Sequence, residues 1–192
     1  MKNISVFCGS SSGFDPIFMQ QASLLGQCVA QRGYGVVYGG ASVGLMGAVA
    51  NSAMQAGGKV IGVIPEFLKK KEIEFDGLSE IHVVDTMHER KALMHELSDA
   101  VIALPGGYGT LDELYEILTW AQLALHKKPI GLLNVKGYYT PLVEMTAKMQ
   151  DNGFLRNDYQ NLLIVEDDIS RLLDKLEMFE PVENDNWFEA IS

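Results

Sequence analysis

The chain has 192 residues, of which 47% are apolar and 21% charged, and its formal net charge at pH 7 is −10. These values are typical of a globular protein and exclude a disordered, collagen-like or coiled-coil chain. The acidic balance argues against nucleic acid and anionic membranes as partners, and without a secretory signal or an apolar run of ~18 residues the expected location is cytoplasmic.

Short apolar segments alternate with longer segments along the whole chain. Several of them, such as residues 101–104 and 130–133, are continuously apolar. That pattern is typical of parallel strands that are covered on both faces. The predicted strands are residues 4–8, 35–38, 59–64, 80–84, 100–104, 129–134 and 162–165.

The segments between these strands predict six helices. Asp15 followed by Pro16 predicts a helix start, because Asp caps a helix and Pro suits its first turn. Thr86 and Glu89 have the spacing of a capping box, which gives Glu89 a structural role. The predicted helices are residues 16–31, 44–55, 86–97, 110–125, 139–150 and 169–179.

This alternation predicts an α/β fold: a Rossmann-like, doubly wound, mostly parallel sheet of about seven strands with helices on both faces. One catalytic domain is expected over residues 1–180, followed by an acidic C-terminal tail at 181–192. Residues 166–192 hold nine acidic and two basic side chains and so carry most of the excess charge. Cys8 and Cys28 form no zinc motif and are expected to be buried thiols.

Ligands of open parallel sheets bind beyond the carboxyl ends of the strands. The first strand here is followed by Cys8, Gly9 and Ser10, and the second by the glycine-rich residues 39–47. The second loop lacks a dinucleotide fingerprint, because Ala41 replaces the middle glycine and no acidic residue ends the next strand. A Walker loop, a serine elbow and a zinc-protease helix are also absent from the sequence.

The fifth strand leads into the clearest motif, which contains Gly106, Gly107 and Gly109. The glycines leave backbone N–H groups uncovered at the start of a helix, which favours a bound phosphate. Thr110 adds a hydroxyl, and Glu113 follows one turn later. The alternative is that Thr110 and Glu113 form only a capping box, which would not explain three glycines in four positions.

Arg90 and Lys91 lie near the N-terminus of the third predicted helix. Positive side chains there oppose the helix dipole, and such a placement is better tolerated beside a bound anion. Arg90 is therefore a candidate ligand-binding residue, with a surface salt bridge as the alternative. Lys91 is expected to touch a phosphate or solvent. Because the two strand ends are successive in the chain, Arg90 and Glu113 are expected to converge over one cleft.

These motifs resemble the LONELY GUY family, the cytokinin riboside 5'-monophosphate phosphoribohydrolases, long labelled lysine decarboxylases. The resemblance covers about residues 2–165. Its most specific parts are P-G-G-Y-G-T-L-D-E at 105–113 and M-H-E-R-K at 87–91. Further matching segments are C-G-S-S (8–11), Y-G-G-A-S-V-G-L-M-G (38–47), S-D-A-V-I-A-L-P-G-G (98–107), T-W-A-Q-L (119–123), H-K-K-P-I-G-L-L-N (126–134) and G-Y-Y (137–139).

The resemblance implies a Rossmann-like homodimer that hydrolyses the N-glycosidic bond of purine nucleoside 5'-monophosphates, with adenine or N6-prenyladenine as the base. It implies no cofactor or metal, and Arg90 and Glu113 as the catalytic pair. The substrate-binding residues implied or expected are Gly9, Ser10, Glu72, Arg90, Lys91, Gly107, Tyr108, Gly109, Thr110, Leu111, Asp112, Glu113 and Gln122. Ala41 and Asp112 depart mildly from the family pattern.

Two alternatives accompany this interpretation. A nucleotide-binding carrier or sensor without turnover would keep the phosphate loop but needs neither Arg90 nor Glu113. A lysine decarboxylase would use pyridoxal phosphate and a Schiff-base lysine, which no residue marks. The apolar helix segment around residues 120–125 is either buried in its own core or part of the implied dimer interface, where Gln122 would face a neighbouring pocket.

Overall fold

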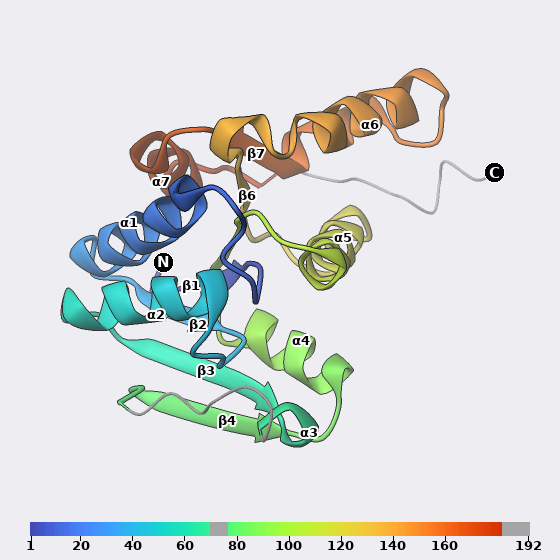
Figure 1. The fold of residues 1–192 in the computed structure, drawn as a ribbon. Coiled ribbons are helices and arrows are strands. Elements are labelled where there is room, and N and C mark those ends of the chain that lie inside the picture. Colours follow the sequence, from blue (N-terminus) through green and yellow to red (C-terminus); the bar gives the residue numbers. More distant parts are fainter. Residues whose placement is uncertain (70–76, 182–192) are drawn as a thin grey trace.

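The computed structural model describes residues 1–69 and 77–181 (Figure 1). The strands are β1 (Asn3–Phe7), β2 (Gly35–Tyr38), β3 (Val60–Pro65), β4 (Glu80–Val84), β5 (Ala100–Ala103), β6 (Ile130–Leu133) and β7 (Leu163–Glu166). The helices are α1 (Pro16–Gln31), α2 (Gly44–Gln55), α3 (Glu66–Lys69), α4 (Met87–Glu96), α5 (Tyr108–Gln122), α6 (Thr140–Asp151) and α7 (Ile169–Glu177). Short 3-10 turns occur at η1 (Val135–Gly137) and η2 (Asn157–Leu162).

The strands form one sheet in the order β4-β3-β2-β1-β5-β6-β7, and every neighbouring pair is parallel. The predicted α/β fold class is therefore confirmed. β2, β3, β5 and β6 are buried along their whole length, as their continuously apolar sequences predicted. β4 differs because it is an edge strand, and its side chains are exposed or half-buried.

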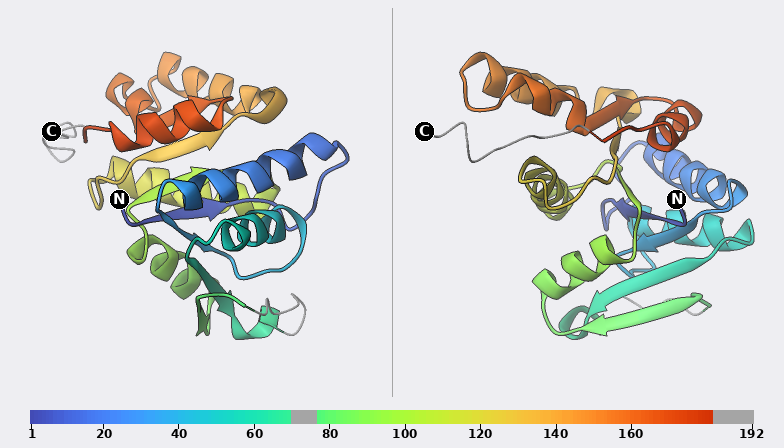
Figure 2. Two further views of the ribbon diagram at one scale, coloured as in Figure 1. Left: turned by 90° about the vertical axis from the view of Figure 1, so that its left-hand side faces the viewer. Right: turned by 180° about the vertical axis from the view of Figure 1, so that it is seen from behind.

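Helices cover both faces of the sheet, which gives three layers (Figures 1 and 2). α1, α2 and α7 cover one face, and α4 and α5 cover the other. Side chains of β5 alternate between these two cores: Ala100 and Ile102 pack on the first, whereas Val101 and Ala103 pack on the second. Burial of one large apolar side chain contributes about 1.5–3 kcal/mol to the stability of the folded state. The two cores together therefore fix the helices on the sheet.

Local capping sets several helix starts where the sequence predicted them. The Asp15 carboxylate accepts a hydrogen bond from the Ile17 N–H at 3.0 Å, and the Thr86 hydroxyl accepts one from the Glu89 N–H at 3.1 Å. The short helix α3 was not predicted. Of the expected acidic tail only Pro181 lies within the described residues. Across residues 1–69 and 77–181, no helix combines the length and hydropathy needed to span a membrane.

The strand order places the functional edge of the sheet. β1 lies next to β5 at the centre, and strand order reverses between them. Loops that follow β1 and β5 therefore diverge to opposite faces and leave a crevice at their carboxyl ends, which is where doubly wound sheets bind ligands.

Candidate active site

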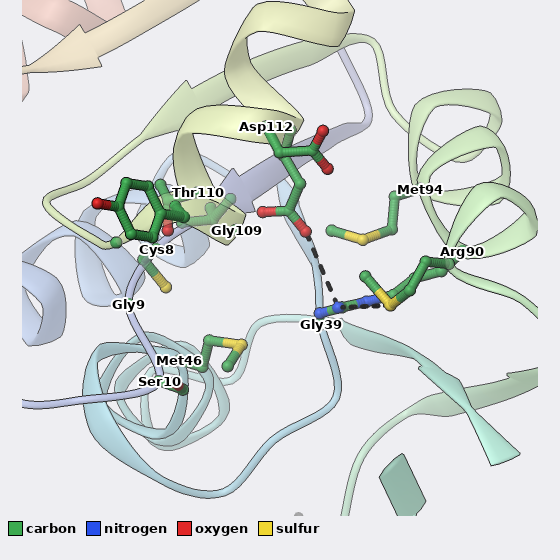
Figure 3. A pocket seen from close by; sticks show the side chains of 15 residues that line it. Cys8, Gly9, Ser10, Gly39, Met46, Arg90, Met94, Gly109, Thr110 and Asp112 are labelled. Atoms are coloured by element: carbon green, nitrogen blue, oxygen red, sulfur yellow. Dashed lines mark hydrogen bonds and ion pairs between the residues drawn. The ribbon is translucent and has the colours of Figure 1, made fainter. Parts of the chain in front are cut away.

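A cleft of about 290 Å³ lies at this carboxyl edge. Its walls come from the loops after β1, β2 and β5 and from helices α2, α4 and α5 (Figure 3). The lining residues are Val6, Cys8, Gly9, Ser10, Gly39, Met46, Met87, Arg90, Met94, Gly107, Tyr108, Gly109, Thr110, Asp112 and Glu113. Most of the residues expected to bind substrate therefore face one cleft.

Arg90 extends from the first turn of α4 into the cleft and is only 7% exposed. Its Nε donates a hydrogen bond to the Val63 carbonyl at 3.2 Å. Gly39 makes room for the guanidinium, since a Cβ atom at that position would lie 1.8 Å from Nη2 (Figure 3). Arginine keeps its proton near neutral pH. The cleft therefore contains a fixed, buried positive charge, and the alternative of a surface salt bridge is wrong.

Glu113 lies opposite Arg90 and is 8% exposed. Its Oε1 is 3.9 Å from Nη1 of Arg90. Burial raises the pKa of Glu113 to about 7, although the positive charge of Arg90 opposes that rise. A carboxyl group with a pKa near neutrality can hold or release a proton under working conditions, which is a property of catalytic carboxyls.

The structure also decides between the alternatives for Glu113. Helix α5 begins at Tyr108, two residues earlier than predicted, and Gly107 is its N-cap. Thr110 already lies inside the helix, so Thr110 and Glu113 do not form a capping box. Glu113 is instead free to face the cleft.

Arg90 and Glu113 meet as expected, but for a different reason. We expected convergence because β4 and β5 follow one another in the chain. In the sheet β3, β2 and β1 lie between them. Helix α4 spans that distance, because it starts after the edge strand β4 and ends before the central strand β5. Arg90 therefore lies close to Glu113 because α4 crosses the sheet, not because β4 and β5 are neighbours.

Lys91 occupies a different place from the one expected. It is 8% exposed, and its Nζ lies 3.0 Å from carboxylate oxygens of both Asp112 and Glu116 on α5. Burial alone would lower the pKa of Lys91, but the hydrogen bonds to Asp112 and Glu116 outweigh it and hold that pKa above its usual value. Lys91 thus joins α4 to α5 as a charged ammonium and reaches the cleft only through Asp112.

The glycines after β5 are needed for the room that their missing side chains leave, not for unusual dihedral angles. None of the three has a positive φ. Gly107 and Gly109 face open space, so a ligand can approach their backbone closely. At Gly106 a Cβ atom would lie 2.1 Å from the Thr110 hydroxyl oxygen, so only glycine fits there. Because α5 has no side-chain cap, its first N–H groups are available to an anion.

The glycine loop after β2 has another role. The Leu45 N–H, at the start of α2, donates to the Gly9 carbonyl at 3.0 Å. The N-terminus of α2 thereby supports the loop that contains Gly9 and Ser10, both of which line the cleft. This contact agrees with the missing dinucleotide fingerprint, because that motif would place a pyrophosphate at this helix start.

Three of the expected substrate-binding residues that the structure describes do not line the cleft. Lys91 is described above, and Leu111 packs partly buried against the core between the sheet, α4 and α5. Gln122 lines a separate groove of about 190 Å³ on the other side of α5. Glu72 lies outside the described residues. Tyr108 does line the cleft but is 93% exposed.

Sequence reasoning did not identify the residues that form the apolar part of the cleft, to which Cys8, Met46, Met87 and Met94 contribute. Burial raises the pKa of the Cys8 thiol well above its usual value, so it stays protonated. These residues come from three elements that are distant in the chain and share no local motif. Within residues 1–69 and 77–181, no three His, Cys, Asp or Glu side chains gather in a way that could hold a metal ion.

Comparison with known sequences identifies close relatives. A family model described as "Possible lysine decarboxylase" matches residues 46–176. The cytokinin riboside 5'-monophosphate phosphoribohydrolase LOG7 of Arabidopsis thaliana is 47% identical over 180 residues, which cover 94% of this chain and 83% of the relative. The probable cytokinin riboside 5'-monophosphate phosphoribohydrolase LOGL2 of Oryza sativa subsp. japonica is 46% identical over 180 residues. These cover 94% of this chain and 74% of the relative.

Comparison with solved structures shows the same architecture in more distant proteins. The molybdenum cofactor carrier protein of Chlamydomonas reinhardtii superposes with a TM-score of 0.70 at 21% identity, over 92% of this chain and 96% of that chain. The molybdenum cofactor binding protein of Rippkaea orientalis gives a TM-score of 0.69 at 24% identity, with 92% and 96% covered. At such low identity the likeness shows the fold alone.

Proposed function

Because the chain belongs to the family that contains the cytokinin riboside 5'-monophosphate phosphoribohydrolases, we propose that it hydrolyses the N-glycosidic bond of purine nucleoside 5'-monophosphates. The products are the free base and ribose 5-phosphate. The observation that carries this proposal is the buried pair of Arg90 and Glu113, 3.9 Å apart, in a cleft that also contains the uncapped start of α5.

The reaction needs a group that stabilises positive charge on the sugar. As the bond between C1' and the base nitrogen breaks, the electron pair leaves with the base and the ribose becomes oxocarbenium-like. The ionised carboxylate of Glu113 would stabilise this cation and orient a water molecule towards C1'. The water oxygen forms the new bond to C1', and a proton from the water ends on the departing base.

Arg90 would act on the other charge that develops. The departing base carries negative charge until it is protonated, and a fixed guanidinium stabilises that charge without giving up its own proton. Arg90 also favours the ionised form of Glu113. The substrate phosphate would bind the N–H groups at the start of α5 together with the Thr110 hydroxyl.

A direct test is to incubate the purified protein with AMP, N6-prenyl-AMP and adenosine and to measure released base. We expect release from the monophosphates and little from adenosine, because the nucleoside leaves the phosphate-binding groups unpaired. Equal turnover of AMP and adenosine would contradict the phosphate site. Tight nucleotide binding with no release would favour the carrier alternative.

The base itself is a finer question. Met46, Met87 and Met94 give the cleft a flexible apolar lining that suits plain or prenylated adenine. We propose that the cleft accepts both bases. The protein would then act as an AMP nucleosidase on plain adenine nucleotides and as a cytokinin-activating hydrolase on prenylated ones. The ratio of kcat/KM for AMP and N6-prenyl-AMP, measured side by side, decides which base is preferred.

The label of lysine decarboxylase does not suit this cleft. A Schiff-base lysine must be able to lose its proton and attack a carbonyl group. Lys91 is the lysine nearest the catalytic pair in sequence, and two carboxylates hold its pKa above the usual value. Such an ammonium is a poor nucleophile, so we do not propose decarboxylation.

We further propose a homodimer formed through α5 and α6. Tyr115 of α5 (37% exposed) lines the groove that contains Gln122, Met145 of α6 (50% exposed) precedes Thr146 of that groove, and Leu125, which follows α5, is 68% exposed. A second copy would cover this apolar surface. Light scattering should give twice the chain mass, and Met145→Asp should shift the protein towards monomer. A monomeric wild-type mass at micromolar concentration would exclude the interface.

We also propose a cytoplasmic location, since both cysteines are free thiols and such thiols are typical of a reducing compartment.

A further inference from the structure

Three consecutive carbonyl groups in the loop after β5 are each bound by a donor from another part of the chain. The Tyr139 hydroxyl donates to the Leu104 carbonyl at 2.7 Å. The Gly9 N–H donates to the Pro105 carbonyl at 3.1 Å. The Tyr138 hydroxyl donates to the Gly106 carbonyl at 2.6 Å. Two of these donors are adjacent tyrosines that lie more than thirty residues further along the chain.

The orientation of these carbonyls decides what the loop presents to a ligand. A carbonyl oxygen that pointed into the cleft would repel a phosphate, whereas N–H groups attract it. The Leu104 and Gly106 oxygens are held by tyrosine hydroxyls that do not line the cleft, and the Pro105 oxygen is held by the N–H of Gly9, so none of the three is left free to face a phosphate. The backbone of Gly107 and Gly109 then meets open space at the start of α5.

The two tyrosines are themselves firmly placed. Tyr139 is 2% exposed, and its backbone N–H donates to the Asn134 side chain at 2.7 Å. Its ring packs edge-on against Tyr138, with centroids 4.9 Å apart. The Tyr138 ring in turn packs edge-on against Phe18 of α1 at 5.9 Å. A ring held on two sides loses little freedom when its hydroxyl forms a hydrogen bond, so the contact can fix the loop.

We propose that Tyr138 and Tyr139 are positioning residues for phosphate binding: their hydroxyl groups hold the loop at residues 104–107 in the conformation that binds the 5'-phosphate. This inference rests on the proposed function, since it assumes that the loop binds the phosphate of the substrate. Tyr138 shows this role most clearly. The residue is 46% exposed, so the core does not require it, yet its hydroxyl reaches the Gly106 carbonyl.

The test removes each hydroxyl and keeps each ring. Tyr138→Phe, Tyr139→Phe and a control, Tyr34→Phe, are compared by calorimetric titration with ribose 5-phosphate and with adenosine. The Tyr34 hydroxyl bonds to Glu177 on α7, away from the loop. Loss of one such hydrogen bond should weaken ribose 5-phosphate binding about fivefold to tenfold in Tyr138→Phe. Adenosine affinity should not change, because it lacks the phosphate.

Kinetics separate positioning from general damage. For AMP we expect KM to rise in Tyr138→Phe by a factor similar to the loss of ribose 5-phosphate affinity, with kcat within about twofold of wild type. Tyr139→Phe should behave in the same way and also lower the denaturation midpoint, because it leaves a buried carbonyl without its partner. Tyr34→Phe should match wild type in KM and kcat.

The outcomes distinguish this inference from the proposed function. If wild-type protein binds ribose 5-phosphate and Tyr138→Phe binds it equally well, the positioning role is refuted and the proposed function stands. If Tyr138→Phe weakens ribose 5-phosphate and adenosine to the same extent, the hydroxyl supports the whole cleft and the inference is again refuted. If wild-type protein does not bind ribose 5-phosphate, the proposed function itself fails.

Discussion

Replacement of Glu113 by glutamine should change how the stability of the protein depends on pH. Burial raises the pKa of Glu113 from 4.5 to about 7 in the folded protein. Between these values the folded state binds one more proton than the unfolded state, so the free energy of unfolding falls as pH rises. A difference of two to three pKa units corresponds to about 3 kcal/mol over that range. The glutamine variant lacks this contribution.

The assay is urea unfolding of wild type and Glu113→Gln at several pH values from 4.5 to above 7. The difference between the two proteins removes the titration of the groups they share. We expect the variant to gain about 3 kcal/mol relative to wild type as pH rises through this window. Glu144, which is exposed on α6, supplies the matched Glu→Gln control.

A stability difference between wild type and Glu113→Gln that stays constant with pH would contradict this prediction. It would mean that Glu113 titrates as it does in the unfolded chain, and therefore that water reaches it in the cleft. Arg90→Met checks whether the pKa of Glu113 changes in the expected direction. Arg90 lowers the pKa of Glu113, so its removal should raise that pKa further and make the loss of stability with rising pH larger.

The other predictions concern activity. If the ionised form of Glu113 is reactive, kcat/KM for AMP should rise with pH and level off above about 7, and a flat profile from pH 5 to 8 would contradict this. Arg90→Ala should lower kcat roughly a hundredfold, and Arg90→Lys should recover little because it lacks the planar guanidinium; a rise in KM alone would assign Arg90 to substrate binding. Gly39→Ala should lower kcat by more than about tenfold, since its methyl group would displace the guanidinium, and a wild-type kcat would show that Arg90 adapts.

Much of the fold could be predicted because it is encoded in local patterns. Continuous apolar runs marked the buried strands, and Asp15 with Pro16 marked the start of α1, where the cap is observed. The start of α5 was predicted two residues late because Gly107, without a capping side chain, gives a weak signal. Strand order is not encoded locally, which is why Arg90 and Glu113 were expected to meet for the wrong reason.

The contacts that support the site were harder to foresee. Helical periodicity places Lys91 about 100° around α4 from Arg90 but says nothing of what lies there, and the structure places carboxylates of α5 beside it. The same limit applies to the hydrogen bond between Tyr138 and Gly106, which joins residues 32 apart in sequence. Such contacts depend on how whole elements pack. A single sequence, considered without an alignment to its relatives, therefore gives no sign of them.

The most direct test of the central claim is a single-turnover experiment with excess enzyme and AMP in water that contains heavy oxygen. We expect wild-type protein to convert the bound nucleotide to adenine and ribose 5-phosphate with the heavy oxygen at C1. We expect Glu113→Gln to bind AMP with similar affinity but to leave it intact. Recovery of intact AMP from the wild-type protein, or full turnover by Glu113→Gln, would contradict the proposed hydrolysis and the role of this carboxylate.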